Sequence, residues 1–203
     1  HFDQGEGVGC GKSDCSVECE CDRFLEVWNL VFTQYDQQED GSYKPLPKKN
    51  IDTGMGLERL AAVVQGVYSN FETDLFQPII QKVASISGTE YGSRPKTDLA
   101  LRVIADHARA VTFALSDGVL PSNEGRGYVI RRVLRRAARF GRVLGINDVF
   151  MHKVAETVIN EMKETYPELE EKASHIFQVI ENEEKRFRLT LEQGSEMFEK
   201  IAS

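Results

Sequence analysis

The stretch Asn50–Arg59, Asn-Ile-Asp-Thr-Gly-Met-Gly-Leu-Glu-Arg, combines residue types that suit a bound anion. Gly54 and Gly56 let the backbone approach a ligand closely, and the helical pattern after them predicts a helix N-terminus whose free N–H groups attract phosphate. Arg59, one turn further, offers a fixed fork of donors for phosphate oxygens. Asp52, just before the glycines, could hold an ammonium group. A triphosphate and an amino acid would use both ends of this stretch, although a strand–turn–helix junction without a ligand has a similar pattern.

The four cysteines all lie within the first 21 residues, with the spacing C-x4-C-x3-C-x-C, at Cys10, Cys15, Cys19 and Cys21. Four thiolates can close a tetrahedral zinc site. A secreted disulfide protein usually spreads its cysteines to link distant segments, so this clustering favours a reduced, cytoplasmic compartment and a metal. The alternative is a loop of reduced thiols without a ligand.

Seven arginines gather in one predicted helix, at Arg126, Arg131, Arg132, Arg135, Arg136, Arg139 and Arg142. Those at 131, 135, 139 and 142 share a helix face, where like charges repel one another unless an anion is present. In a protein with a net charge of −7, such a stripe predicts contacts with a phosphate backbone. The alternative is an internal network with Asp and Glu; the uniform use of arginine favours a nucleic acid.

The elements that must position these groups predict an α+β fold, an antiparallel sheet followed by helices. Residues 23–35 are apolar, aromatic and β-branched, as expected of a buried strand. Glu26 and Asn29 interrupt this strand. A buried charge there requires a partner such as a magnesium ion or a ligand amine, unless Glu26 faces solvent at an edge. Residues 42–51 return as an extended segment, which Pro45 and Pro47 place at an edge of the sheet.

Helical periodicity covers most of the remaining chain. It predicts helices over residues 56–68, 74–87, 97–116, 127–142 and 147–166, and a long helix from Pro167 nearly to Ser203. That last helix has a polar gap at Glu183 and Glu184 and carries no predicted chemistry. A linker at 89–96 divides the chain into a sheet-containing domain, residues 1–90, and an all-helical domain, residues 91–203.

The composition is that of a soluble globular protein. Hydrophobic residues make up 41% and charged residues 28% of the 203 residues, and no apolar run approaches the roughly 20 residues of a membrane helix. The net charge of −7 argues against nucleic-acid binding by the whole surface but allows a local basic patch. Because the sequence starts with neither a methionine nor a signal peptide, we expect a piece of a longer chain.

Several of these blocks resemble one family in the order in which they occur. Asp52–Arg59 is similar to the third signature motif of class II aminoacyl-tRNA synthetases, in the form found in the alanyl-tRNA synthetase family, and Leu25–Phe32 resembles the strand before that motif. Arg102–Arg109 and Pro121–Arg132 resemble the helical tRNA-recognition region of the same family. The clustered cysteines resemble an insertion found in some bacterial members.

The resemblance implies both a fold and an activity. Residues 1–90 would be the C-terminal part of the class II aminoacylation domain, and the helices would recognise the tRNA acceptor stem. The family activates alanine with ATP to alanyl-adenylate and transfers the alanyl group to tRNA(Ala). The implied partners are therefore alanine, ATP, tRNA(Ala) and the remaining domains of the parent chain, with no membrane.

The resemblance also assigns roles to single residues. Arg59 would be the catalytic residue on the ATP phosphates. ATP and Mg²⁺ would be held by Glu26, Asn29, Gly54, Gly56 and Arg59, and alanine by Asp52 and Gly54. Asn123 would read a G·U pair of the acceptor stem, and the nearby RNA backbone would be held by Arg126, Arg131, Arg132, Arg135 and Arg136.

One departure from the family pattern bears on activity. Nothing before Glu26 supplies the first two class II motifs, so we expect the isolated chain not to form adenylate. Two other functions fit the same residues: a non-catalytic tRNA- or RNA-binding module with an incomplete nucleotide site, and a zinc-dependent regulator built on the four cysteines.

Overall fold

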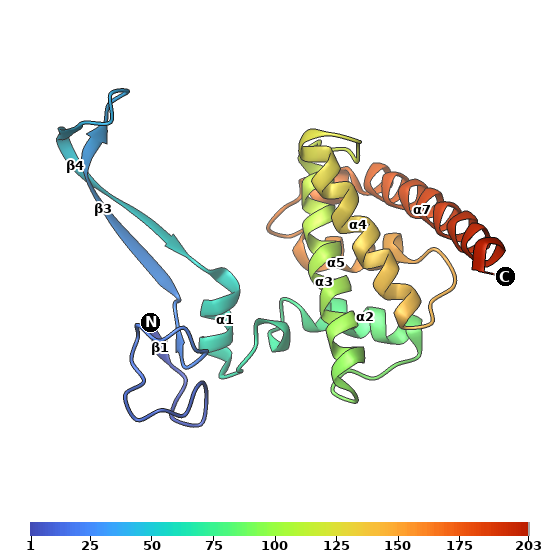
Figure 1. Cartoon of the computed structure of the whole chain (residues 1–203), viewed down its shortest axis with the longest axis horizontal. Coiled ribbons are helices and arrows are strands. Elements are labelled where there is room, and N and C mark those ends of the chain that lie inside the picture. Colours follow the sequence, from blue (N-terminus) through green and yellow to red (C-terminus); the bar gives the residue numbers. More distant parts are fainter. Residues whose placement is uncertain (203) are drawn as a thin grey trace. The chain divides into compact units, whose positions relative to one another are not determined.

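The computed structural model describes residues 1–202 and has the predicted α+β architecture (Figure 1). The chain divides into two compact units, His1–Thr73 and the residues from Asp74 onward. Helix α2 (Gln77–Ser87) belongs to the second unit, because it packs against α3 (Pro95–Ser116) and α5 (Met151–Met162). The division by packing therefore comes earlier than the linker at 89–96, and the functional boundary after residue 90 remains a prediction.

The first unit is built from two small antiparallel sheets and a helix. Strand β1 (Phe2–Asp3) pairs with β2 (Phe24–Leu25), and the long hairpin joins β3 (Trp28–Gln37) to β4 (Tyr43–Met55). Helix α1 (Leu57–Gln65) follows directly, with a short 3-10 turn at Asn70–Glu72 after it. The predicted strand, extended return and helix are thus confirmed, and the polar turn between the strands contains Gly41 at φ 81°.

The two faces of the β3–β4 hairpin differ in polarity because paired residues share a face and the faces alternate along each strand. Trp28 pairs with Met55 and Phe32 with Ile51, which makes one face apolar. The expectation that this strand is buried is wrong for the described residues, since Trp28 is 57% and Phe32 64% exposed. A two-stranded ribbon covers neither of its own faces, so burial requires another layer.

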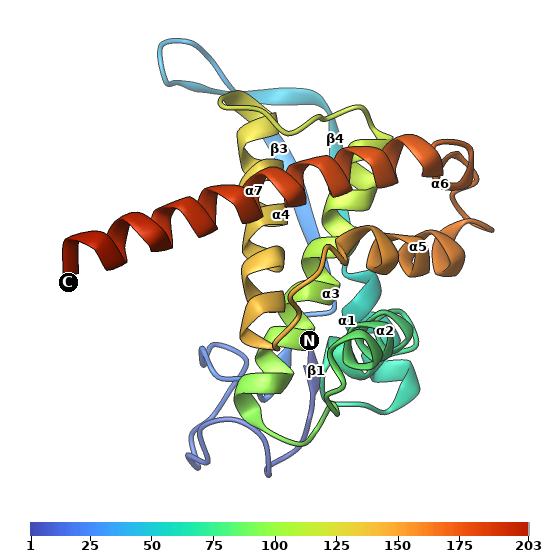
Figure 2. The same cartoon turned by 90° about the vertical axis from the view of Figure 1, so that its right-hand side faces the viewer.

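The second unit is all helical. Besides α2, α3 and α5 it contains α4 (Gly125–Val143), α6 (Glu168–Glu171) and α7 (Ala173–Ala202). Helix α3 contacts each of the others and forms the centre, while α7 crosses α4 and extends beyond it (Figure 2). Each fully buried Leu, Ile or Phe side chain contributes about 1.5–3 kcal/mol. The fully buried side chains of this core include Ile79, Ile80, Leu101, Ile104, Leu134, Phe150, Ile176 and Ile180.

The single long helix expected from Pro167 is wrong, since the chain breaks at Lys172 between α6 and α7. Lys172 has φ −99° and ψ 3°, and its Nζ donates a hydrogen bond to the carbonyl of Ser116 at 2.7 Å. That contact satisfies a carbonyl at the C-terminal end of α3, which has no partner within its own helix. The break between α6 and α7 therefore places Lys172 where it can cap the C-terminal end of α3.

We expect Gly141→Ala to destabilise the helical unit. Gly141 lies in α4 against the ring of Phe150, which is 1% exposed, and an added Cβ would overlap that ring. Overpacking of this kind costs about 1–3 kcal/mol, which exceeds the gain of up to ~1 kcal/mol in helix propensity. Urea unfolding followed by circular dichroism measures the change.

Gly194→Ala is the matched control for this change. Gly194 is also helical, in α7, but an added Cβ there meets no atom within 4 Å. We expect it to leave stability unchanged or to raise it by up to ~1 kcal/mol. Equal effects at the two glycines would contradict the packing of α4 on Phe150.

Candidate functional site

The four cysteines lie together in one cluster, with all four Sγ atoms within 4.8 Å of one another. The Sγ atoms of Cys10 and Cys19 are 3.8 Å apart, and those of Cys15 and Cys21 are 3.5 Å apart. Disulfide sulfurs would be about 2.0 Å apart. Four thiolates at about 2.3 Å around a tetrahedral zinc ion would be roughly 3.8 Å from one another. The spacing of the thiols therefore fits a closed zinc site and excludes disulfides.

The thiols also differ in acidity. Backbone hydrogen bonds from Arg23 and Cys10 lower the pKa of Cys21 to about 6. Burial and the neighbouring Cys21 raise the pKa of Cys15 to about 12. The N–H groups are thus arranged around a sulfur that carries negative charge, as the ligand sulfurs of a metal do.

The backbone around the cluster has little else to hold it. Among the described residues before Ala62, none is buried. The segment is closed by the short β1–β2 pair and by Arg23, whose Nε and Nη2 contact the two carboxylate oxygens of Asp3 at 2.9 and 3.0 Å. Gly9, at φ 91°, lets the chain pass over Cys21, because a Cβ there would lie 2.8 Å from Cys21 Sγ. A small loop without a hydrophobic core needs a cross-link to stay folded, and a bound metal ion can supply that cross-link.

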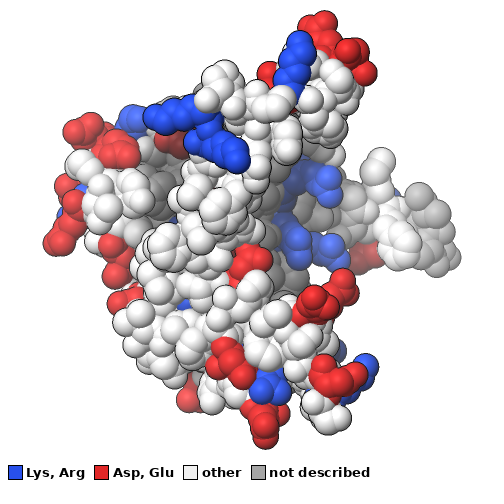
Figure 3. Space-filling view, turned by 90° about the vertical axis from the view of Figure 1, so that its left-hand side faces the viewer, with Lys and Arg blue, Asp and Glu red and all other residues white. Residues whose placement is uncertain are grey.

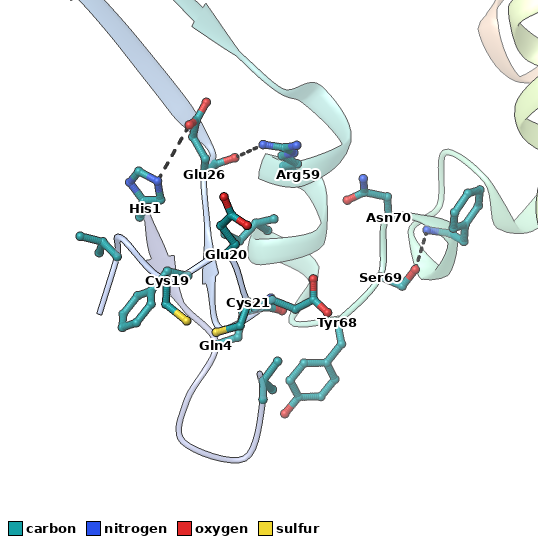
Figure 4. A pocket seen from close by; sticks show the side chains of 16 residues that line it. His1, Gln4, Cys19, Glu20, Cys21, Glu26, Arg59, Tyr68, Ser69 and Asn70 are labelled. Atoms are coloured by element: carbon teal, nitrogen blue, oxygen red, sulfur yellow. Dashed lines mark hydrogen bonds and ion pairs between the residues drawn. The ribbon is translucent and has the colours of Figure 1, made fainter. Parts of the chain in front are cut away.

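Two of the predicted nucleotide-site residues, Glu26 and Arg59, meet at one pocket of the first unit (Figure 4). Nη1 of Arg59 donates to the backbone carbonyl of Glu26 at 2.7 Å, while the Glu26 carboxylate lies 3.9 Å from Nε2 of His1. The pocket has a volume of about 650 Å³ and also exposes Ser69 and Asn70. Arg59 is exposed, so its remaining donors are available to a ligand.

The other predicted residues of this site lie on the polar face of the hairpin. Asn29 pairs directly with Gly54, and Val31 pairs with Asp52, so Asn29 and Asp52 are diagonal neighbours on one face. All four are exposed. An added Cβ at Gly54 would meet no atom within 4 Å, which leaves room above the backbone for a ligand.

Gly56 lies against the side chain of Arg59, and its role at the ligand site remains a prediction. A Cβ at Gly56 would lie 3.3 Å from Cδ of Arg59, so the glycine makes room for the side chain of Arg59. Gly56 is also the N-cap residue of α1, and no side chain caps that end of the helix. Gly56 has no side chain and therefore supplies no capping acceptor at this end of α1.

Five of the seven arginines of α4 fall into two sets, and the first set contacts α7. Nε of Arg131 and Nε of Arg135 donate to the same oxygen, Oε1 of Glu183, at 2.9 and 2.7 Å. Glu183 is only 4% exposed. Nη1 of Arg131 also donates to Oδ1 of Asn123. The internal network that the sequence left as an alternative thus exists for these two arginines.

The second set, Arg132, Arg136 and Arg139, is exposed and lines a pocket to which Arg135 of the first set also contributes. The pocket has a volume of about 520 Å³ and also contains Tyr128 and Phe187. The guanidinium of Arg132 lies 5.7 Å from the centre of the Tyr128 ring. Among the described residues, no carboxylate lies within 4.0 Å of these three guanidinium groups, although the charge of Arg136 helps to lower the pKa of Asp106. On the face shown in Figure 3, acidic and basic side chains are interspersed.

Sequence reasoning missed the role of Glu183 and Glu184. Glu184 is fully buried, and its Oε2 accepts N–H bonds from Phe150 at 3.1 Å and Met151 at 2.9 Å. Burial raises the pKa of Glu184, while these N–H groups and Arg188 offset the rise only in part. This carboxylate also fixes the start of α5 at Met151, later than the predicted Asn147. Glu183 and Glu184 interrupt the apolar positions of this helix, and that interruption was the signal in the sequence for both residues.

Comparisons with known proteins place these features in one family. A family model described as tRNA synthetases class II (A) matches residues 1–203. The alanine–tRNA ligase of Desulforamulus reducens is 60% identical over 197 residues, which cover 97% of this chain and 22% of that relative. The alanine–tRNA ligases of Pelotomaculum thermopropionicum and Carboxydothermus hydrogenoformans are 56% and 57% identical over 201 residues, each covering 99% of this chain and 23% of the relative. The chain thus spans less than a quarter of the length of these relatives. No helix in the described part of the chain is long and apolar enough to cross a membrane.

Proposed function

The chain belongs to the family of class II (A) tRNA synthetases, and from this premise we propose that it is part of a cytoplasmic alanine–tRNA ligase. The observation that carries the proposal is identity of 56–60% to alanine–tRNA ligases over nearly the whole chain. The enzyme would activate alanine with ATP and transfer the alanyl group to tRNA(Ala). The first unit would supply one wall of the alanine and ATP site, and the second would bind the acceptor stem.

In the activation step, the alanine carboxylate attacks the α-phosphate of ATP and pyrophosphate leaves. Arg59 holds phosphate oxygens and neutralises the charge that moves, which is the largest contribution a protein makes to such a reaction. Asp52 holds the alanine ammonium group, with the open backbone of Gly54 beside it. No protein nucleophile is required.

Glu26 and Asn29 would hold Mg²⁺. The carboxylate and amide oxygens of these residues are the hard donors that this ion prefers, and both side chains are exposed. When bound, Mg²⁺ supplies positive charge to the phosphate oxygens. This chain's own contribution is to fix the position of Glu26, through the hydrogen bond from Arg59 to its carbonyl.

We also propose that Cys10, Cys15, Cys19 and Cys21 hold one zinc ion. The distances between the sulfurs support a tetrahedral site. With four thiolates the coordination is complete, so the ion would order the loop and take no part in the reaction.

In the helical unit, the phosphate backbone of the acceptor stem would be bound by three exposed arginines, Arg126, Arg132 and Arg136. Asn123 would read the G·U pair. The hydrogen bonds from Arg131 and Arg135 to Glu183 would keep α4 and α7 in place beside each other. Phosphate contacts of this kind fix register, whereas base contacts give specificity.

The test of the proposed function is alanine-dependent ATP–pyrophosphate exchange by the complete gene product. Exchange that depends on alanine supports it. RNA binding without any exchange would instead favour the alternative, a non-catalytic RNA-binding module.

We expect Arg132→Ala and Arg136→Ala to weaken binding of an acceptor-stem minihelix regardless of its sequence. Removing one arginine–phosphate pair reduces the slope of log K against log salt by about 0.7–0.9. Fluorescence anisotropy at several salt concentrations measures both the affinity and the slope.

Lys153→Ala is the control for this change, because it removes one exposed positive charge from α5 rather than from the pocket. We expect it to leave the slope unchanged. A reduction of the slope in Lys153→Ala equal to that in Arg132→Ala would show that net charge, not the α4 pocket, carries the binding.

A further inference from the structure

The buried carboxylate of Glu183 is connected to Asn123 through a single side chain. Oε1 of Glu183 accepts from Nε of Arg131 at 2.9 Å, and Nη1 of Arg131 donates to Oδ1 of Asn123. The three residues belong to three different segments: α7, α4 and the loop before α4. Glu183 and Arg131 are 52 residues apart in sequence, so this link is made only in the folded unit.

The rigid guanidinium of Arg131 lets Glu183 determine how Arg131 is oriented toward Asn123. The guanidinium is planar and rigid, so an acceptor that holds Nε also fixes where the Nη donors point. Arg135 donates to the same Glu183 oxygen at 2.7 Å, which fixes that oxygen from a second side. Glu183 is 4% exposed, and the low local dielectric strengthens its hydrogen bonds.

The loop that carries Asn123 is otherwise held by contacts that do not involve the Asn123 side chain. Ser122 Oγ donates to the carbonyl of Glu124 at 2.7 Å, and Gly127 lies against Leu120 and Ser122 so closely that a Cβ would overlap them. The side chain of Asn123 itself is exposed. Its orientation therefore depends on Arg131, whose bond to Oδ1 leaves the Asn123 amide NH₂ free to donate to an acceptor on RNA.

We infer that Glu183 is a positioning residue for RNA discrimination, which orients Asn123 through Arg131 without touching RNA itself. The inference rests on the proposed function, in which Asn123 reads the G·U pair. Its neighbour Glu184 provides a contrast, because that equally buried carboxylate binds the start of α5 and Arg188 and makes no contact with Arg131 or Asn123.

The test uses the complete gene product and two acceptor-stem minihelices that differ only in a G·U or G·C pair. The measured quantity is the ratio of the two dissociation constants. We expect Glu183→Met, which keeps the side-chain length but removes both oxygens, to reduce this ratio by about tenfold, the scale of one mismatched base pair. Glu183→Gln retains one oxygen acceptor and should recover part of the ratio.

The matched control is Glu184→Met, the same change one residue along α7. It removes a buried carboxylate as well and should lower the thermal midpoint, but it should leave the ratio as in the wild type. In a double-mutant cycle, Glu183→Met should have no further effect on the ratio once Asn123 is alanine, because both changes then interrupt the same interaction.

Several outcomes would overturn the inference. If the wild type discriminates and Glu183→Met folds but discriminates equally well, Glu183 does not act on Asn123. Additive losses of Glu183→Met and Asn123→Ala would lead to the same conclusion. If the wild type binds both RNAs equally, the proposed reading role of Asn123 fails and the inference fails with it. Should Glu183→Met not fold, Arg131→Lys asks the same question, since one ammonium cannot replace the two separate donors; an unchanged ratio there would also overturn it.

Discussion

Replacing Cys21 or Cys15 by serine is expected to weaken zinc binding by about two orders of magnitude and to destabilise the N-terminal segment of the protein. The metal-binding free energy of small zinc domains is about 10–16 kcal/mol and is also their folding free energy. Loss of one ligand in four removes on the order of 3 kcal/mol, or about two orders of magnitude in the dissociation constant. The effect on structure should be large because no described residue before Ala62 is buried.

The measurement is metal content of the protein purified under reducing conditions, together with proteolysis of the first 23 residues. The wild type should contain one zinc ion per chain and resist cleavage, and a chelator should convert it to the behaviour of the variants. Ser13→Ala, an exposed change in the same loop, is the control and should retain the metal. A wild-type protein that takes up no zinc, and whose loop resists proteolysis equally in Cys21→Ser, would contradict the assignment.

Arg59→Ala in the complete protein is expected to lower kcat/KM for alanine-dependent ATP–pyrophosphate exchange by about 10²–10³-fold, the cost of removing one preorganised charge-stabilising group. The loss should fall mainly on kcat, because the charge that develops on the α-phosphate and on the leaving pyrophosphate is stabilised mainly in the transition state. Arg59→Lys should recover little, since an ammonium cannot both donate to the Glu26 carbonyl and fork around a phosphate.

Lys44→Ala controls for the loss of a positive charge in the same unit. Lys44 lies near the tip of the β3–β4 hairpin, paired with Asp36. Thermal unfolding separates a catalytic loss from a structural one, because Arg59 also contributes one hydrogen bond to the fold. Exchange rates in Arg59→Ala within a few-fold of those in Lys44→Ala would exclude Arg59 from the phosphate site.

Local features of the fold were predictable from the sequence. The helix predicted over 74–87 ends at Ser87, and Gly88 follows it in the left-handed conformation at φ 65°. The helices over 97–116 and 127–142 follow from apolar residues at helical spacing, since that spacing is a property of each segment alone. The clustered cysteines likewise indicated a metal site, because all four lie within the first 21 residues.

Features that depend on distant residues were not predictable in the same way. The apolar β3 strand suggested burial, but whether Trp28 and Phe32 are covered depends on a second layer that the strand itself cannot specify. The arginine stripe could not be divided into internal and exposed members, because Glu183, which separates them, lies about 50 residues further along the chain. The polar gap at Glu183–Glu184 marked an unusual position without naming its partners.

The measurement that tests the central claim most directly is charging of an acceptor-stem minihelix with alanine by the complete protein. It requires both the amino-acid and ATP wall of the first unit and the RNA-binding surface of the second. We predict charging of the minihelix that carries the G·U pair, with alanine as the amino acid, and loss of charging when that pair is changed to G·C while alanine-dependent exchange continues. Charging of neither RNA, or equal charging of both, would contradict the proposed division of work between the two units.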